Sequence, residues 1–350
     1  MVSAEAGARG DEAVTRVAIV GCGAVGTKRS RALVDSRLVL AVDADPGRAE
    51  RLAAAHEGCG VGTDSAAAVG RDDVDLVIVA TTNDALTPVA LAAVRHGKHV
   101  LVEKPAARSA AELRPLVEAA RAAGVVAKVG FNHRFHPGVR RARELCGAGA
   151  VGPLLYVRGR YGHGGRLGYE QEWRADPSRA GGGELLDQGV HLIDLARWFI
   201  GDFTEAWGVA ETFFWKMKVE DNAFVLLRTA DGRVAWIHAS CTEWKNLFSL
   251  EVFGRDGKLQ VDGLGGSYGT ERLTHYRMRP EMGPPETTCW EYPGEDVSWR
   301  EEYKHLLDCI RDDRPPCGGL EDALAALEVV ESVYRQSRRP PLPETGQDAP

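Results

Sequence analysis

Three groups of residues in this sequence have the types and spacing that chemistry requires. The first is a GxGxxG pattern that directly follows the apolar run 17–20. In this context Gly21 permits a tight turn, Gly23 admits a pyrophosphate to the backbone, and Gly26 lets helix and strand pack closely. The alternative is a turn that serves packing alone. The helix that follows would point its amides at phosphates, so we expect a dinucleotide to contact Gly21, Cys22, Gly23, Ala24, Val25 and Gly26.

Asp43, which ends the next apolar run 38–42, belongs to the same group. Its carboxylate can accept both hydroxyls of a ribose and would repel a 2′-phosphate, which favours NAD over NADP. Arg48 and Arg51 follow closely enough to attract a 2′-phosphate, so NADP remains the less favoured option.

The second group is Glu103-Lys104-Pro105, directly after the apolar run 99–102. Ligands of doubly wound sheets lie beyond the carboxyl ends of the strands, so we expect Lys104 in the cofactor crevice. Glu103 would orient Lys104 or balance its charge, and Pro105 would fix the turn, with a cis bond as one option. The alternative is a solvated loop lysine.

The third group is Asp187 and His191, which follow the glycines 181–183 in a predicted helix. Residues four apart share one helix face, and Asp194 lies one turn further on. A histidine that titrates near neutrality suits proton exchange with a hydroxyl. A capping aspartate with a packed histidine is the alternative. A metal pair is a further one, but no other ligands are spaced for zinc, so we expect no metal.

The elements that must position these residues begin with short apolar runs that alternate with helices, an arrangement typical of a parallel sheet covered on both faces. We expect an α/β, doubly wound Rossmann domain over residues 14–131. Its predicted strands are 17–20, 38–42, 76–80, 99–102 and 125–129. Its predicted helices include 46–56, 85–94 and 110–123.

Beyond residue 131 the pattern changes to β-like segments without helices between them, which favours a mostly antiparallel sheet with one helical face. Asp231-Gly232 and Asp256-Gly257 are hairpin signals. We expect an α+β domain over 132–341, with tails at 1–13 and 342–350. The predicted strands are 154–161, 204–214, 222–229, 233–241, 248–253 and 258–261. The predicted helices are 137–145, 185–200, 301–311 and 320–335.

Composition excludes several classes of partner. The 350 residues carry a net charge of −7 without a basic block, so no nucleic acid is expected. No apolar stretch is long enough for a membrane span and the first residues lack a secretory layout, so no membrane partner is expected. The seven cysteines form no CxxC pair, which favours reduced thiols and a cytoplasmic protein.

Taken together, the motifs resemble the Gfo/Idh/MocA oxidoreductase family, over roughly residues 14–341. The resemblance rests on VAIVGCGAVG at 17–26, VDADPGRA at 42–49, VATTNDAL at 79–86, GKHVLVEKPAA at 97–107, GFNHRFHP at 130–137 and GGGELLDQGVHLIDLARW at 181–198. It implies a Rossmann domain followed by an open sheet that packs sheet to sheet in homodimers or homotetramers. It also implies NAD or NADP as hydride carrier, a catalytic Lys104, and Asp187 and His191 near the reacting carbon.

The sequence departs from the family after residue 80. Relatives often carry Thr-Pro-Asn-x-x-His there, whereas this chain reads Thr81-Thr82-Asn83 and has Leu86 in place of the histidine. The backbone and Asn83 could still hold the nicotinamide ribose. Further cofactor contacts are expected from Thr81, Thr82, Asn83, Glu103 and Lys104.

The segment 161–174 is polar, aromatic and rich in glycine, so it could fold over the crevice. Many hydroxyls need many polar partners, and this segment offers them. A polyhydroxylated substrate is therefore expected: a sugar, aminosugar, cyclitol or nucleotide sugar. The Ala, Arg and Gly bias is compatible with a role in secondary metabolism. Expected substrate contacts, each with a surface role as its alternative, are Lys104, Arg134, His163, Arg166, Tyr169, Trp173, Arg174, Asp187 and His191.

The expected reaction is oxidation of a secondary alcohol, or its reverse. His191 would take the hydroxyl proton while Lys104 and Asp187 position the hydroxyl and moderate its charge. One alternative is an NAD-dependent glycosidase that recycles its own cofactor. Another is a non-catalytic protein that senses NAD, although such a protein has no use for a proton relay.

Overall fold

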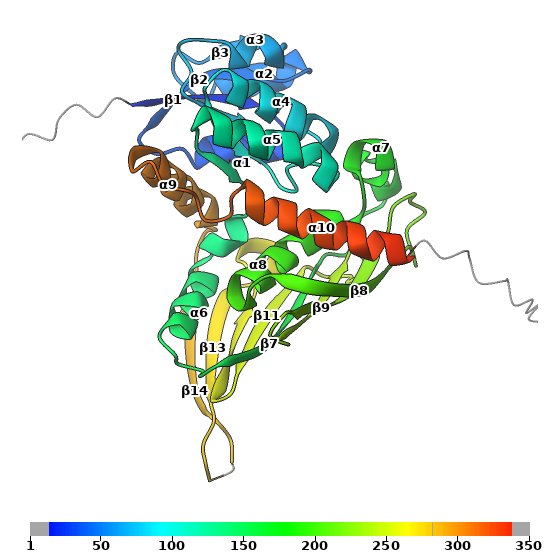
Figure 1. Ribbon diagram of the computed structural model, residues 1–350. Helices are drawn as coiled ribbons and strands as arrows, with labels where there is room; N and C mark the ends of the chain where they lie inside the picture. Colours follow the sequence, from blue (N-terminus) through cyan, green and yellow to red (C-terminus); the bar gives the residue numbers. More distant parts are fainter. Residues whose placement is uncertain (1–13, 282, 338–350) are drawn as a thin grey trace, which may run out of the picture.

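The computed structural model describes residues 14–281 and 283–337, which form two β-sheets with helices packed on them (Figure 1). The expected tails, 1–13 and 342–350, lie outside the described residues, as does the expected domain end at 341. None of the helices in the described part of the chain is long and apolar enough to cross a membrane.

The first sheet is parallel throughout, with strand order β3-β2-β1-β4-β5-β6. This confirms the predicted Rossmann fold. The order reverses between β1 and β4, and that is where ligands bind in doubly wound sheets. The short edge strand β3 escaped prediction because its three residues are not buried and two of them are glycines. The strands are β1 (Thr15–Val20), β2 (Ser36–Val42), β3 (Gly60–Gly62), β4 (Leu76–Val79), β5 (His99–Val102) and β6 (Ala127–Val129).

Helices cover both faces of this sheet, which explains why its strands are apolar at every position. On one face Val79 packs with Leu86 of α4 and Leu113 of α5. On the other face Ile19 packs with Leu52 of α2 and Leu306 of α9. The helices are α1 (Ala24–Arg31), α2 (Pro46–Ala53), α3 (Ser65–Val69), α4 (Asn83–Arg95) and α5 (Ala110–Ala123).

Helix α9 (Ser298–Arg311) comes from the far end of the chain, yet it supplies part of the cover of the first sheet. Helix α10 (Leu320–Ser337) packs against α5 on one side and against α8 (Val190–Ile200) and β8 (Phe203–Glu211) on the other. In Figure 1 it lies between the first sheet's helices and the second sheet. The two parts of the fold are therefore joined by helices as well as by the chain between them.

The second sheet has the order β14-β13-β12-β11-β7-β10-β9-β8 and is antiparallel except where β7 pairs with β10. This confirms the predicted open, mostly antiparallel sheet. The edge strand β14 and its neighbour β13 were not predicted because neither contains a continuous run of buried apolar residues. The strands are β7 (Leu154–Gly162), β8 (Phe203–Glu211), β9 (Asn222–Thr229), β10 (Val234–Ser240), β11 (Leu247–Gly254), β12 (Gly257–Asp262), β13 (Glu271–Arg277) and β14 (Glu286–Tyr292).

One face of the second sheet carries helices α6 (Pro137–Gly147), α8 (Val190–Ile200) and α10 (Figure 1). The five residues before α8, Leu185–Gly189, form a π turn rather than the expected α-helix. This turn and the short helix α7 (Pro177–Ala180) stand beside the carboxyl edge of the first sheet. The fold thus brings the third motif group to the first two.

Candidate active site

A cleft of about 1000 Å³ runs along the carboxyl edge of the first sheet. Its walls come from the glycine turn, the ends of β2, β4 and β5, the segment 173–179 and the π turn. The predicted residues that line it are Gly21, Cys22, Gly23, Ala24, Val25, Asp43, Thr81, Thr82, Asn83, Glu103, Lys104, Trp173, Arg174 and Asp187. The structure thus assembles residues that lie up to 166 positions apart in one cleft.

The glycine turn has the three properties that its sequence predicts. Gly21 has a φ of +95°, and a Cβ there would overlap the carbonyl of Ala80. A Cβ on Gly26 would overlap the carbonyl of Gly21, and Gly26 lies behind the cleft wall. Beside Gly23 there is open space. Of the three glycines, only Gly23 therefore has free space beside it for a phosphate.

Asp43 holds the turn as well as lining the cleft. Its Oδ2 accepts the Cys22 N–H at 2.7 Å, and its Oδ1 accepts the Asp45 N–H at 2.9 Å. These two bonds fix the carboxylate while leaving lone pairs for a ribose. Arg48 and Arg51 line the same end of the cleft.

The segment after β4 reaches across the cleft. Asn83 donates from Nδ2 to the carbonyl of Ala180 at 2.9 Å, which connects α4 to α7. Leu86, at the position where relatives often have histidine, is fully buried in the apolar core. Its side chain therefore supports the sheet and does not reach the cleft.

Lys104 and Asp187 form an ion pair at the inner end of the cleft. The Lys104 ammonium also donates to the Asp187 carbonyl at 2.7 Å, and the Arg174 Nε lies 3.3 Å from the Asp187 Oδ2. Burial alone would raise the pKa of Asp187, but these two cations hold it well below its ordinary range. Asp187 is thus a carboxylate at any pH near neutrality.

Glu103 is not the partner of Lys104 that the sequence suggested. Its carboxylate is 7 % exposed, borders the cleft and pairs with Arg29 of α1 at 2.5 Å. Burial raises the pKa of Glu103 against the opposing charge of Arg29. The peptide bond between Lys104 and Pro105 is cis.

Asp187 lines the cleft, whereas His191 does not. Leu185–Gly189 form a π turn instead of the expected α-helix, so the helical spacing that predicted a shared face does not apply there. His191 is 3 % exposed, and its ring centroid lies 3.9 Å from that of His133. Burial, and then the charge of Lys104, lower the pKa of His191 well below its usual range. The imidazole is therefore a neutral base.

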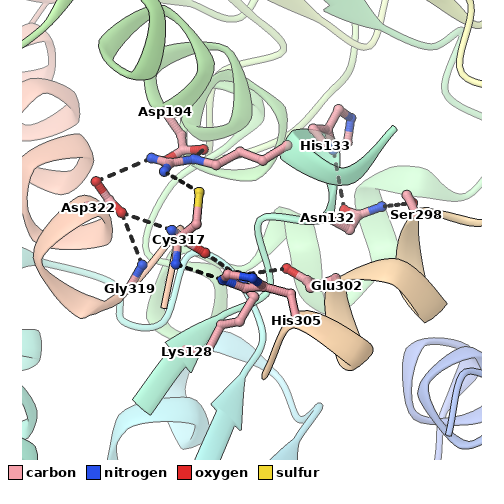
Figure 2. A network of polar contacts seen from close by, with 12 residues as sticks. Lys128, Asn132, His133, Asp194, Ser298, Glu302, His305, Cys317, Gly319 and Asp322 are labelled. Carbon is pink, nitrogen blue, oxygen red and sulfur yellow. Dashed lines mark hydrogen bonds and ion pairs between the residues drawn. The ribbon is translucent and has the colours of Figure 1, made fainter. Parts of the chain in front are cut away.

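Arg134, an expected substrate contact, does not line the cleft. It is 4 % exposed and donates to Asp194 at 2.6 and 2.8 Å, with Asp322 3.2 Å away. Figure 2 shows Asp194, Asp322 and Cys317 in this network, and none of the three lines the cleft. Asp194 belongs to the same network, because both of its carboxylate oxygens accept hydrogen bonds from Arg134. The sequence alone does not show that Arg134 has carboxylate partners, because Asp194 and Asp322 lie far along the chain.

Three other expected substrate contacts do not line the cleft. Arg166 lies at the surface and pairs with Glu172. Tyr169 and His163 lie behind the cleft wall, next to Glu184. In the described chain, no group of three His, Cys, Asp or Glu residues is arranged to hold a metal ion.

Sequence reasoning missed Glu220, which holds the start of the π turn. Its carboxylate accepts the N–H groups of Gly183 and Leu185 at 2.9 and 3.0 Å and the Tyr334 hydroxyl at 2.6 Å. Side chains on Gly182 or Gly183 would overlap Tyr334 or Glu220. These glycines are therefore required by packing rather than by flexibility. No local signal could have found Glu220, since it lies in a loop before β9.

The titration of Glu220 gives a testable pH dependence. Burial raises the pKa of Glu220 from 4.5 to about 7. The folded state therefore holds this proton more tightly, so the stabilisation is complete below about pH 4.5 and is lost as the pH rises through about 7. A shift of this size corresponds to roughly 3 kcal/mol. Glu220→Gln should remove this dependence.

Urea unfolding between pH 5 and 8 measures the effect. The free energy of unfolding of the wild type should fall relative to that of Glu220→Gln as the pH rises. Glu205→Gln, at an exposed position, is the matched control. Parallel pH curves for wild type and Glu220→Gln would contradict the assignment.

The fold and cleft define a two-part oxidoreductase with an NAD-binding Rossmann fold. Two family models match, the "Oxidoreductase family, NAD-binding Rossmann fold" over 15–131 and the "GFO/IDH/MocA C-terminal domain" over 139–260. The chain is 30% identical over 286 residues to inositol 2-dehydrogenase 2 of Saccharopolyspora erythraea, covering 79% of this chain and 76% of that protein. The chain belongs to the Gfo/Idh/MocA oxidoreductase family, which confirms the resemblance.

Two further comparisons concern levoglucosan dehydrogenase. The enzyme of Pseudarthrobacter phenanthrenivorans is 29% identical over 222 residues, and the match covers 53% of this chain and about half (55%) of that protein. A structure of levoglucosan dehydrogenase in complex with NADH and L-sorbose has a TM-score of 0.83 and 22% identity, and covers 92% of this chain and 96% of that one. This structural likeness supports the fold.

Proposed function

We propose that this chain is an NAD-dependent dehydrogenase that oxidises a secondary hydroxyl of a sugar or cyclitol, or runs the reverse reduction. The observation that carries the proposal is the Lys104–Asp187 pair at the inner end of the cleft that begins at the glycine turn. A cation and a carboxylate held together at a strand end, beside a nucleotide turn, suit a hydroxyl that must lose a proton and a hydride.

The residues present fit the cofactor. The space beside Gly23 and the fixed carboxylate of Asp43 match a pyrophosphate and a ribose. Thr81, Thr82 and Asn83 line the continuation of the cleft towards Lys104. When bound, NAD supplies the acceptor for the hydride.

The protein's own part is to position the hydroxyl and handle its proton. The Lys104 ammonium, held by Asp187, stabilises negative charge that develops on the substrate oxygen. His191 does not line the cleft, but it is close enough to Lys104 for the charge of that lysine to lower its pKa, and it is neutral, so it is the proposed proton acceptor. Trp173, with the Arg174 guanidinium 4.6 Å from its ring, lines the cleft together with Asp187.

Absorbance at 340 nm tests the proposal directly. The purified protein is offered NAD and NADP against cyclitols, free sugars, aminosugars and nucleotide sugars. NADH formation with one substrate class is expected. A flat trace with release of an aglycone from a glycoside would instead identify a glycosidase that recycles its cofactor, and NADH binding without any turnover would identify a sensor.

Cofactor choice gives a second testable prediction. In Asp43→Ser the repulsion of a 2′-phosphate is lost while Arg48 and Arg51 still line that end of the cleft. The ratio of NADH to NADPH affinity should fall by about 10-fold or more, the effect of one charge interaction of over 1.4 kcal/mol. Fluorescence titration of both reduced cofactors measures it, with Asp72→Ser as the surface control. An unchanged ratio would contradict the role of Asp43.

We also propose that the chain forms a homodimer or homotetramer through the open face of its second sheet. Trp207, Leu226 and Trp236 lie opposite one another on β8, β9 and β10 and are 44%, 42% and 36% exposed. A contiguous apolar row of this kind on a soluble chain favours burial against a second copy. The seven free cysteines support a reducing, cytoplasmic compartment.

Leu226→Arg, in the middle of this row, is expected to shift the protein to monomers because it buries a charge in the interface. Light scattering after gel filtration measures the mass in solution. Val61→Arg, at an exposed apolar position on the first sheet, is the matched control. A wild type that is already monomeric at micromolar concentration would contradict the proposal.

A further inference from the structure

A small chamber opens from the inner end of the cleft, past Asp187. It shares Asn83, Trp173, Arg174 and Asp187 with the cleft. Its remaining walls come from Tyr169, Ala180, Gly182, Gly183, Glu184, Met217 and Val219. Its volume of about 10 Å³ holds one water-sized group.

Glu184 gives this chamber its chemistry. The side chain is 2 % exposed, and its Oε1 accepts the Tyr169 hydroxyl at 3.0 Å. The Oε2 is buried and has no hydrogen-bond partner among the described residues. His163 lies 3.6 Å from the Oε1, and the thiol of Cys241, a weak donor, is nearby. An acceptor oxygen without a strong donor is costly in a buried place.

The position of Glu184 connects this oxygen to the reacting group. Glu184 immediately precedes the π turn that carries Asp187. Both line the chamber. Because Asp187 lines both the cleft and the chamber, the chamber adjoins the place where Lys104 and Asp187 would hold a substrate.

We propose that this chamber is a subsite for one hydrogen-bond donor of the substrate, a hydroxyl or an amino group near the reacting carbon, and that Glu184 selects it. The inference rests on the proposed dehydrogenase function and names the substituent that the enzyme requires. Groups that only accept hydrogen bonds are rejected there, because they would face the free oxygen of Glu184 without a proton.

Analogues of the best substrate from the cofactor screen test the proposal on the wild-type enzyme. Each ring hydroxyl in turn is replaced by hydrogen, by fluorine, which is similar in size but cannot donate, or by an amino group. At one position besides the reacting one, kcat/KM should fall at least 100-fold for hydrogen and fluorine and be retained for hydroxyl or amino. The ratio of the last two shows which donor the subsite prefers.

The variant Glu184→Gln sharpens the test, since its amide can present a donor in place of the free oxygen. At the same ring position the penalty for fluorine should shrink at least 10-fold while substrates altered elsewhere keep their relative rates. Glu118→Gln, on the exposed face of α5, is the matched control. If Glu184→Gln does not fold, the wild-type series alone decides.

Two results would overturn the inference. One is a wild type that tolerates fluorine at every non-reacting position, which would mean that the chamber holds only water. The other is a Glu184→Gln variant with an unchanged preference. In both cases NADH still forms, whereas the absence of NADH with any substrate would instead count against the proposed function.

Discussion

Replacing Lys104 with methionine is expected to lower kcat by about 10²–10⁴-fold, the usual contribution of a group that stabilises charge or aids proton transfer in the transition state. Methionine fills most of the volume of the side chain but removes the ammonium that bonds Asp187 twice. Asp187 would keep only Arg174, 3.3 Å away, as a charged partner. Stopped-flow or steady-state NADH formation measures the loss.

The cofactor should still bind this variant, because the glycine turn and Asp43 lie at the opposite end of the cleft. NADH affinity within a few-fold of wild type, together with the loss of kcat, would separate a catalytic role from a folding defect. Lys304→Met, at an exposed position on α9, is the matched control. Wild-type turnover by Lys104→Met would remove the basis of the proposed mechanism.

The second large effect concerns stability. Arg134→Met is expected to lower the free energy of unfolding by about 3–5 kcal/mol, the usual result of breaking a buried ion pair from one side. The variant would leave Asp194, which is 1 % exposed, without its guanidinium partner. Equilibrium denaturation in urea measures the change, and the protein that remains folded should keep the wild-type KM.

Arg140→Met is the control for this variant, since Arg140 is exposed and lies 3.9 Å from its nearest carboxylate on Glu301. The double variant Arg134→Met/Asp194→Leu should regain part of the lost stability because no uncompensated charge remains at that pair. A raised KM at unchanged stability would restore Arg134 as a substrate contact.

The need of buried charges for a partner also explains why Glu103 pairs with Arg29 and not with Lys104. Arg29, fully buried, binds Glu103 on one side and Glu302 of α9 on the other, and Glu302 lies 3.3 Å from Lys128. Figure 2 shows Lys128 and Glu302 in this interior. Buried charges are tolerated only in such mutual pairs. Glu103 therefore pairs with the buried Arg29, and Lys104 pairs with Asp187.

The sequence by itself determined the first sheet, its glycine turn and the positions of Asp43 and Lys104. These features depend on local causes: apolar runs form the strands, glycine permits the turn, and a residue directly after a buried strand must lie at the edge where ligands bind. The short β3, the edge strand β14 and its neighbour β13 lacked such a run, so their existence was decided by pairing with neighbouring strands.

Only the tertiary structure decided which polar residues face the cleft. Arg134 meets Asp194, Glu103 meets Arg29 and Glu220 meets Tyr334, each across 60 to 114 residues of chain. Leu185–Gly189 adopted a π turn where the sequence predicts an α-helix, and the packing left an oxygen of Glu184 without a hydrogen-bond partner among the described residues. A buried polar group needs a hydrogen-bond partner, and the fold can supply that partner from any part of the chain. The spacing of residues in the sequence therefore does not indicate which partner it is.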